Sequence, residues 1–156
     1  MYLIPLDSFL KKSQLQFSLA EIISKRIFKP RKDCEQISLG QSIDWESRHK
    51  DIDRNWRMQL QGWAIFFPIM NGFDEYDNKQ ELIEFFFEVM IDWYQNYGED
   101  SNDIVTTRMP KSYAWYDMSV GFRALVIAFF KNRFEHFKLD ATEKQKNILS
   151  RMIKKH

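Results

Sequence analysis

The amino-acid sequence predicts an all-α protein that forms one domain over residues 1–156, and three observations support this prediction. Glycine and proline, which interrupt regular structure, account for only 5 and 4 residues. Apolar residues recur at spacings of three and four over long stretches, as they do on the buried face of a helix. Residues that favour helix starts precede several of these stretches. A chain of this length can also bury a substantial core.

The first predicted helix spans about residues 6–27 and ends before Pro30. A helix rarely continues through the residue that precedes a proline, so we expect a break here. Residues 31–52 are rich in polar side chains and are predicted to form a connector, with one short extended piece at residues 37–39.

The second predicted helix follows Asp53, a cap-like residue, and runs to about Met70. Its large apolar residues recur at spacings of four, three, four and three, which aligns them on one face. These residues are Trp56, Leu60, Trp63, Phe67 and Met70. Pro68 lies near the end and is predicted to kink the last turn.

The third predicted helix runs from Asp77 to about Tyr97. Asp77 and Gln80 are spaced so that each side chain can cap a backbone amide near the other, and Gly98 is placed to end the helix. Its apolar residues form two adjacent stripes rather than one. We therefore expect this helix to contact two neighbours.

The fourth predicted helix covers about residues 112–134. Its apolar row, expected to point inward, is Trp115, Met118, Phe122, Leu125 and Phe129.

The fifth predicted helix begins at a capping box formed by Asp140 and Glu143 and runs to His156. Its inward residues are predicted to be Ile148, Leu149, Met152 and Ile153. An apolar face at this position, with no later helix to cover it, favours self-association. A homodimer through the C-terminal helix is therefore a predicted partner arrangement.

Composition excludes several classes of function. Lys and Arg total 23 against 22 for Asp and Glu, so we expect no nucleic-acid partner. The longest apolar stretch is about nine residues, shorter than a membrane span, and the N-terminus lacks an export pattern. We expect a soluble, cytoplasmic chain. One Cys, three scattered His and no glycine-rich phosphate loop predict no metal and no cofactor.

Polar residues embedded in the two Trp-rich helices are the candidate site. Indole rings can stack on sugars while Arg and amide groups bind hydroxyls and carboxylates, which would give a carbohydrate groove. The candidate substrate-binding residues are Trp56, Arg57, Gln59, Trp63, Trp115 and Arg123. The alternative is a buried core whose polar groups bond across helices, and aromatic stripes at helical spacing favour it.

Two expectations distinguish cleft from core. We expect Trp63 to be mostly buried, and at least one of Trp56 and Trp115 to be only partly buried, because polar neighbours need solvent or partners. We expect Arg123 to be structural, with Asp117 or Asp92 as its ion-pair partner.

Four motifs occur in a specific order: residues 53–63 (DRNWRMQLQGW), 74–76 (DEY), 91–93 (IDW) and 115–123 (WYDMSVGFR). In order and spacing they resemble the N-terminal helical part of heparinase II/III-like polysaccharide lyases. The resemblance covers about residues 44–134.

The resemblance implies antiparallel helical hairpins that form part of an α/α toroid around a cleft. Members of that family cleave acidic polysaccharides by β-elimination, in which a base removes a proton and an acid protonates the leaving oxygen. The family's catalytic Asn-His segment, its Tyr and its later His have no match here, so no catalytic residue is carried over. The six candidate residues match the family's helical motifs by position.

The sequence therefore predicts the helical segment of such a lyase, able to bind acidic polysaccharide but inactive as an enzyme by itself. The alternative function is a helical interaction module that self-associates or docks on a protein.

Overall fold

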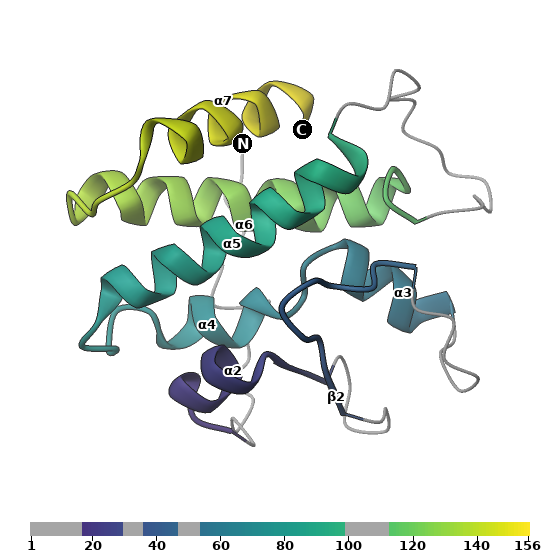
Figure 1. The fold of residues 1–156 in the computed structure, drawn as a ribbon, viewed down its shortest axis with the longest axis horizontal. Helices are drawn as coiled ribbons and strands as arrows, with labels where there is room; N and C mark the ends of the chain where they lie inside the picture. Colours follow the sequence, from purple (N-terminus) through teal and green to yellow (C-terminus); the bar gives the residue numbers. More distant parts are fainter. Residues whose placement is uncertain (1–16, 30–35, 47–53, 99–112) are drawn as a thin grey trace, which may run out of the picture.

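The computed structural model describes residues 17–29, 36–46, 54–98 and 113–156, which are mostly helical (Figure 1). Six helices lie in these residues: α2 (Leu19–Lys25), α3 (Arg54–Gln61), α4 (Phe66–Gly72), α5 (Lys79–Tyr97), α6 (Asp117–His136) and α7 (Glu143–Lys155). The predicted mainly helical class is confirmed. The predicted helix start at Asp53 and the first part of the helix at residues 6–27 lie outside the described residues.

One small sheet corrects the all-α prediction. Strands β1 (Ile27–Phe28) and β2 (Ile37–Ser38) pair antiparallel, with Ile27 opposite Ser38 and Phe28 opposite Ile37. The first helix ends earlier than predicted because Arg26 adopts a left-handed conformation with a φ of 48°. The chain then leaves the helix and buries the two β1 side chains against the core.

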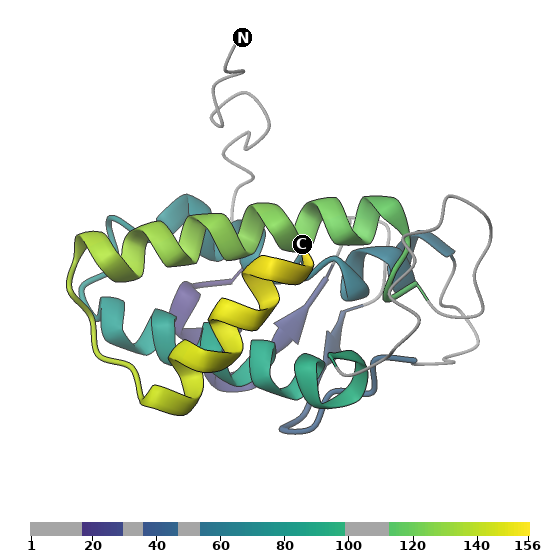
Figure 2. The ribbon, with the colours of Figure 1, turned by 90° about the horizontal axis from the view of Figure 1, so that it is seen from above.

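The helices are arranged around α6, which contacts α3, α4, α5 and α7. The two long helices α5 and α6 lie side by side, and α7 lies across both of them (Figure 2). On the opposite side, α4 contacts α6 and is covered in turn by α2. The centre of this arrangement is aromatic: Phe86 and Phe130 stack with ring centroids 4.6 Å apart, and Phe66 packs edge-on against both.

The predicted second helix is two helices, because the chain turns between α3 and α4. Trp63 has a φ of 60°, a left-handed conformation that usually requires glycine. The Trp63 amide donates to the Leu60 carbonyl (3.0 Å), and the Ala64 amide donates to the Gln59 carbonyl (2.9 Å). This pair of bonds is the Schellman pattern, which satisfies the last carbonyls of a helix.

Glycine stands at position 62, one residue before the left-handed one, because α6 approaches there. A Cβ at Gly62 would lie 2.9 Å from the Phe122 ring. Position 63 instead supplies a fully buried indole. A kink was predicted at Pro68, but the chain instead turns at Trp63, five residues earlier. Pro68 lies in the first turn of α4, where an amide has no helical acceptor to lose.

The remaining helix ends differ from prediction by a few residues. The N-cap of α5 is Asn78, whose side chain accepts from the Glu81 amide, in place of the predicted Asp77. Gly98 ends this helix as predicted. The capping box of α7 uses Thr142 and Gln145 in place of Asp140 and Glu143.

Two predicted inward faces are corrected. In α6, Met118 is 46% exposed, whereas the buried residues are Ser119, Arg123, Val126, Ile127 and Phe130. In α7, Leu149 and Met152 are buried as predicted, but Ile153 is 40% exposed. No helix in the described ranges is long and apolar enough to cross a membrane.

Candidate functional site: a buried polar cluster around Arg123

Arg123 is the only charged side chain that is buried among the residues the structure describes, and it has no exposed surface. Its Nη1 donates to the Gln61 carbonyl (2.5 Å), its Nη2 donates to the Ala114 carbonyl, and its Nε donates to Nε2 of His156 (3.0 Å). The guanidinium therefore joins the end of α3, the segment before α6 and the end of α7.

Two indoles enclose the guanidinium. Its central carbon lies 4.2 Å from the centroid of the Trp93 ring and 5.7 Å from that of Trp115. Cation–π attraction of this kind is strengthened where water is excluded. Burial lowers the pKa of Arg123 from its ordinary value to about 9, and the neighbouring Tyr97 hydroxyl opposes the shift. The side chain therefore stays charged at neutral pH.

The ion-pair partner expected for Arg123 is absent from its described contacts. Asp92 instead accepts from Nε1 of Trp45 (2.6 Å), and Asp117 accepts from the Met118 amide (2.7 Å). The partial negative charge at the C-terminus of α3 takes the place of a carboxylate, because its last residue, Gln61, supplies an acceptor carbonyl. The structural role expected of Arg123 fits its burial, but the predicted partners are wrong.

Gln61 is the second centre of the cluster. Its Nε2 donates to the Trp45 carbonyl (3.0 Å) and to the Tyr97 hydroxyl (3.1 Å), and its Oε1 accepts from Nε1 of Trp93 (2.8 Å). The Tyr97 hydroxyl donates in turn to Glu46 (2.5 Å). One amide side chain thereby holds the segment at residues 36–46 against α5.

His156 closes the cluster from α7. Because its Nε2 accepts from Arg123, its Nδ1 carries the proton and donates to the Met152 carbonyl (3.0 Å). Its ring also stacks on Trp115, with centroids 5.6 Å apart and an interplanar angle of 29°.

The six candidate residues fall into two groups. Trp56, Trp63 and Arg123 are buried, whereas Arg57, Gln59 and Trp115 are half-buried. The expected pattern for the indoles is confirmed: Trp63 has no exposed surface, and Trp115 is only partly enclosed.

The structure brings three of the candidates together through a residue that was not among them. Trp63 and Trp115 both pack edge-on against Trp93, at centroid distances of 5.9 and 5.6 Å, and Arg123 covers the same ring. Trp56 lies apart and packs against Phe28 of β1 at 5.2 Å.

Sequence reasoning also omitted Gln61 and His156 from the candidate site. Trp93 belongs to the motif at residues 91–93, so the resemblance already pointed to this residue. Gln61 lies two residues from Gln59 in the same helix, and only the fold shows which of the two amides is buried.

The cluster connects α6 to the end of α3, to α5 and to the end of α7. The Arg123 guanidinium donates to two carbonyl oxygens and an imidazole nitrogen, which together hold a fixed cation. Over the described ranges no group of three or more His, Cys, Asp or Glu side chains could hold a metal ion. Comparisons with protein-family models, curated proteins and solved structures give no significant match.

Proposed function

We propose that this chain is the N-terminal helical segment of a heparinase II/III-like polysaccharide lyase, which binds acidic polysaccharide but does not cleave it alone. The observation that carries the proposal is contact between three of the four motifs. Gln61, Trp93 and Arg123 come from three different motifs and bond or pack directly with one another. The remaining motif, residues 74–76, lies elsewhere, and its Asp74 pairs with Arg133 at 2.7 Å.

This contact agrees with the resemblance, which places these motifs on helices that pack against one another. It also assigns the motifs to the scaffold, since these three side chains are buried.

In this proposal α5, α6 and α7 are successive hairpins of a partial α/α toroid. Each of these helices contacts the other two, and their directions alternate along the chain (Figures 1 and 2). Helical hairpins require such alternation; a short connection, residues 137–142, joins α6 to α7, whereas the longer stretch 98–116 joins α5 to α6.

Among the six candidates, contact with sugar falls to the half-buried ones, Arg57, Gln59 and Trp115. The large hydrophobic side chains exposed in the described residues are Met118 and Ile153. That only these two are exposed among the described residues supports a polar ligand over the alternative of an apolar protein-docking face.

The test is retention of the chain on immobilised heparan-type and alginate-type polymers, compared with neutral dextran. We expect retention on the acidic polymers alone, weakening as salt is added, and no ultraviolet-absorbing unsaturated product. Equal retention of the chain on dextran and on the acidic polymers would contradict the binding proposal. A sustained, protein-dependent rise in absorbance would contradict the proposed inactivity.

A further inference from the structure

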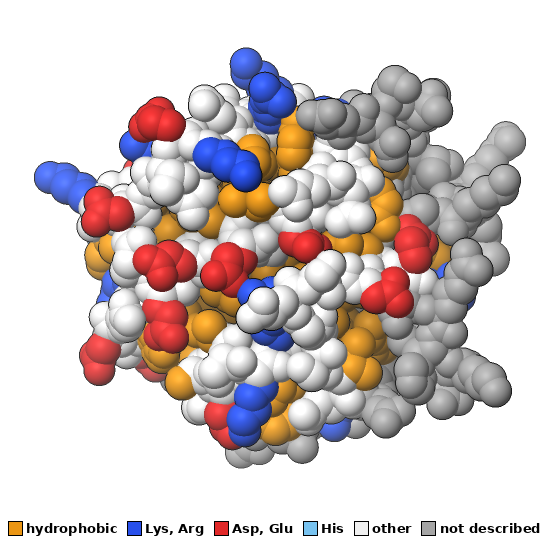
Figure 3. All heavy atoms as spheres, in the orientation of Figure 1, with side chains coloured by type: hydrophobic (Ala, Val, Ile, Leu, Met, Phe, Trp, Pro, Cys, Tyr) orange, Lys and Arg blue, Asp and Glu red, His pale blue; other side chains and the backbone are white. Residues whose placement is uncertain are grey.

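Charge is segregated between two helices that pack together. α7 contains five Lys or Arg residues and one Glu, whereas α5 contains four Asp or Glu residues and one Lys. Basic side chains gather over α7 and acidic ones across α5 on the face drawn in Figure 3. The whole chain has a net charge of only +1, so the basic surface of α7 does not reflect a general excess.

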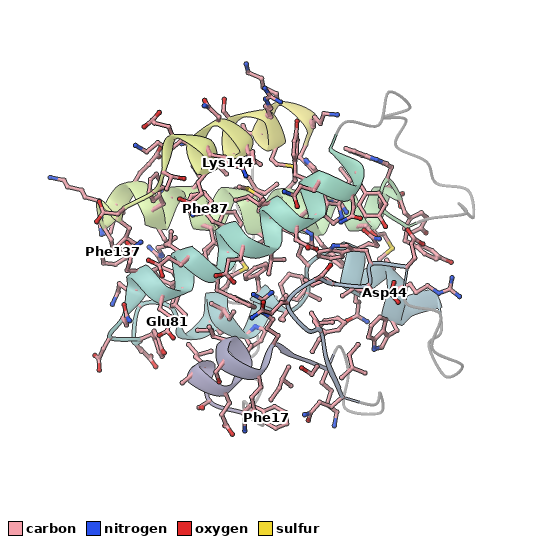
Figure 4. The ribbon with its side chains drawn as sticks, in the orientation of Figure 1. Phe17, Asp44, Glu81, Phe87, Phe137 and Lys144 are labelled. Atoms are coloured by element: carbon pink, nitrogen blue, oxygen red, sulfur yellow. The ribbon has the colours of Figure 1, made fainter. Side chains whose placement is uncertain are left out.

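One side of α7 carries most of this charge. Lys144, Asn147, Arg151 and Lys154 recur at spacings of three, four and three, which aligns them on one helix face, and all four are exposed (Figure 4 labels Lys144). We call these four residues the outer face of α7. They point away from Leu149 and Met152, which bury the opposite side.

The outer face has no carboxylate of its own. The single acidic residue of α7, Glu143, pairs with Lys146 (3.0 Å), and neither belongs to this face. Lys144 and Lys154 form no ion pair within the part of the chain that the structure describes. Two cations therefore stand without a neutralising partner at the surface.

The basic surface continues to an indole. Lys155 lies one turn after Arg151, and its Nζ is 5.7 Å from the centroid of Trp115. Trp115 is only half-buried, so part of this side chain is exposed beside Lys155. A row of cations that ends beside an aromatic ring suits a polymer with acidic groups and apolar ring surfaces, such as a uronate chain.

We propose that the outer face of α7 is where an acidic polysaccharide binds, lying along the helix toward Trp115. This inference rests on the proposed function and adds the location of the ligand; of the three half-buried candidates, it assigns the sugar contact to Trp115. Carboxylate and sulfate groups bind Lys144, Arg151 and Lys154. One nitrogen of the Arg151 guanidinium, Nη1, also donates to the Tyr94 hydroxyl (3.3 Å), which orients the side chain on the surface of α7.

The width of the surface selects a polysaccharide over a nucleic-acid duplex. The outer face is about 15 Å long and one helix wide. It runs beside α5, where Glu84 and Glu88 are exposed. A single polysaccharide chain can follow α7 without approaching these carboxylates, whereas a nucleic-acid duplex is wider than a helix and would be repelled by them.

The test compares two variants of the full chain that each lose three positive charges. One carries Lys144→Gln, Arg151→Gln and Lys154→Gln on the outer face. The control carries Lys25→Gln in α2, Lys131→Gln in α6 and Lys138→Gln in the turn after α6. Affinity for alginate and heparin is measured at low salt by calorimetry, beside dextran and a duplex oligonucleotide, after circular dichroism confirms helical content.

We expect affinity for the acidic polymers to fall about tenfold or more in the outer-face variant and less than about twofold in the control. Equal losses in both variants would overturn the location while leaving the proposed function intact. Absence of binding by the unmodified chain would overturn both. Tighter binding of the oligonucleotide than of the polysaccharides would overturn the choice of ligand.

Discussion

Arg123 packs between two indoles and donates hydrogen bonds to two backbone carbonyls. It carries a positive charge, yet none of these contacts is with a carboxylate. The negative end of α3 explains how this is tolerated, because Gln61 presents its carbonyl at that end. Sequence reasoning sought an acidic partner because buried cations are usually paired. A helix terminus provides the same attraction but leaves no acidic residue to be found in the sequence.

The substitution Arg123→Met tests this role. It keeps much of the side-chain volume but leaves the Gln61 and Ala114 carbonyls without their donor and removes the cation–π contact. We expect the free energy of unfolding to fall by about 3 kcal/mol, since each unsatisfied buried group costs about 1–3 kcal/mol. Urea denaturation followed by circular dichroism measures the change.

The control is Arg133→Met in the same helix. Arg133 pairs with Asp74 at 2.7 Å near the surface, where such pairs contribute about 0–1 kcal/mol. If both substitutions cost the same, Arg123 has no special structural role.

Among the elements, α5 was best predicted, because its ends carry residues with clear local preferences and its apolar face is wide. The face of α6 was predicted less well. This helix contacts four others, so apolar residues surround it and no single stripe dominates. The break between α3 and α4 was missed because Trp63 adopts a left-handed conformation that its residue type disfavours.

Gly62→Ala tests whether the approach of α6 requires glycine at this turn. The added methyl would lie 2.9 Å from the Phe122 ring and 3.1 Å from the Met58 carbonyl. We expect a loss of about 1–3 kcal/mol in the free energy of unfolding, the usual cost of overpacking. Urea denaturation measures it, and Phe122→Leu in the same chain should recover part of the loss.

A matched control lies in the opposing helix. At Gly121 a methyl group would meet nothing within 4 Å, so Gly121→Ala should stabilise α6 by about 0.5–1 kcal/mol. Destabilisation by both substitutions would mean that contact with Phe122 is not the cause.

For the molecule as a whole, the mainly helical class followed from periodicity and from the scarcity of glycine and proline. The partners of each helix did not follow, because periodicity shows that a face is buried but not what covers it. The sequence also does not show which of two similar residues enters the candidate site. Gln59 and Gln61 have the same side chain, yet it is Gln61 that accepts a hydrogen bond from Trp93. The short sheet also depended on tertiary contact, since two-residue strands carry little local signal.

Most buried hydrophobic residues form one large continuous cluster that extends from Leu19 in α2 to Met152 in α7, and Met58, Tyr113 and Tyr116 form a second, small one. A shared core of this kind predicts that the helices unfold together rather than in separate units. All five indoles contribute, since Trp45, Trp56, Trp63 and Trp93 are buried and Trp115 is half-buried. We therefore expect urea transitions followed by Trp fluorescence and by far-ultraviolet circular dichroism to have the same midpoint.

Leu149→Ala makes this expectation specific, because it removes a buried side chain from α7, which lies far along the chain from four of the indoles. The cavity should lower the free energy of unfolding by about 2–5 kcal/mol. In a cooperative molecule, fluorescence and circular dichroism midpoints shift together by the same urea concentration. If only part of the circular dichroism signal moves while the fluorescence transition stays in place, α7 unfolds independently, and the core is divided between α7 and the other helices.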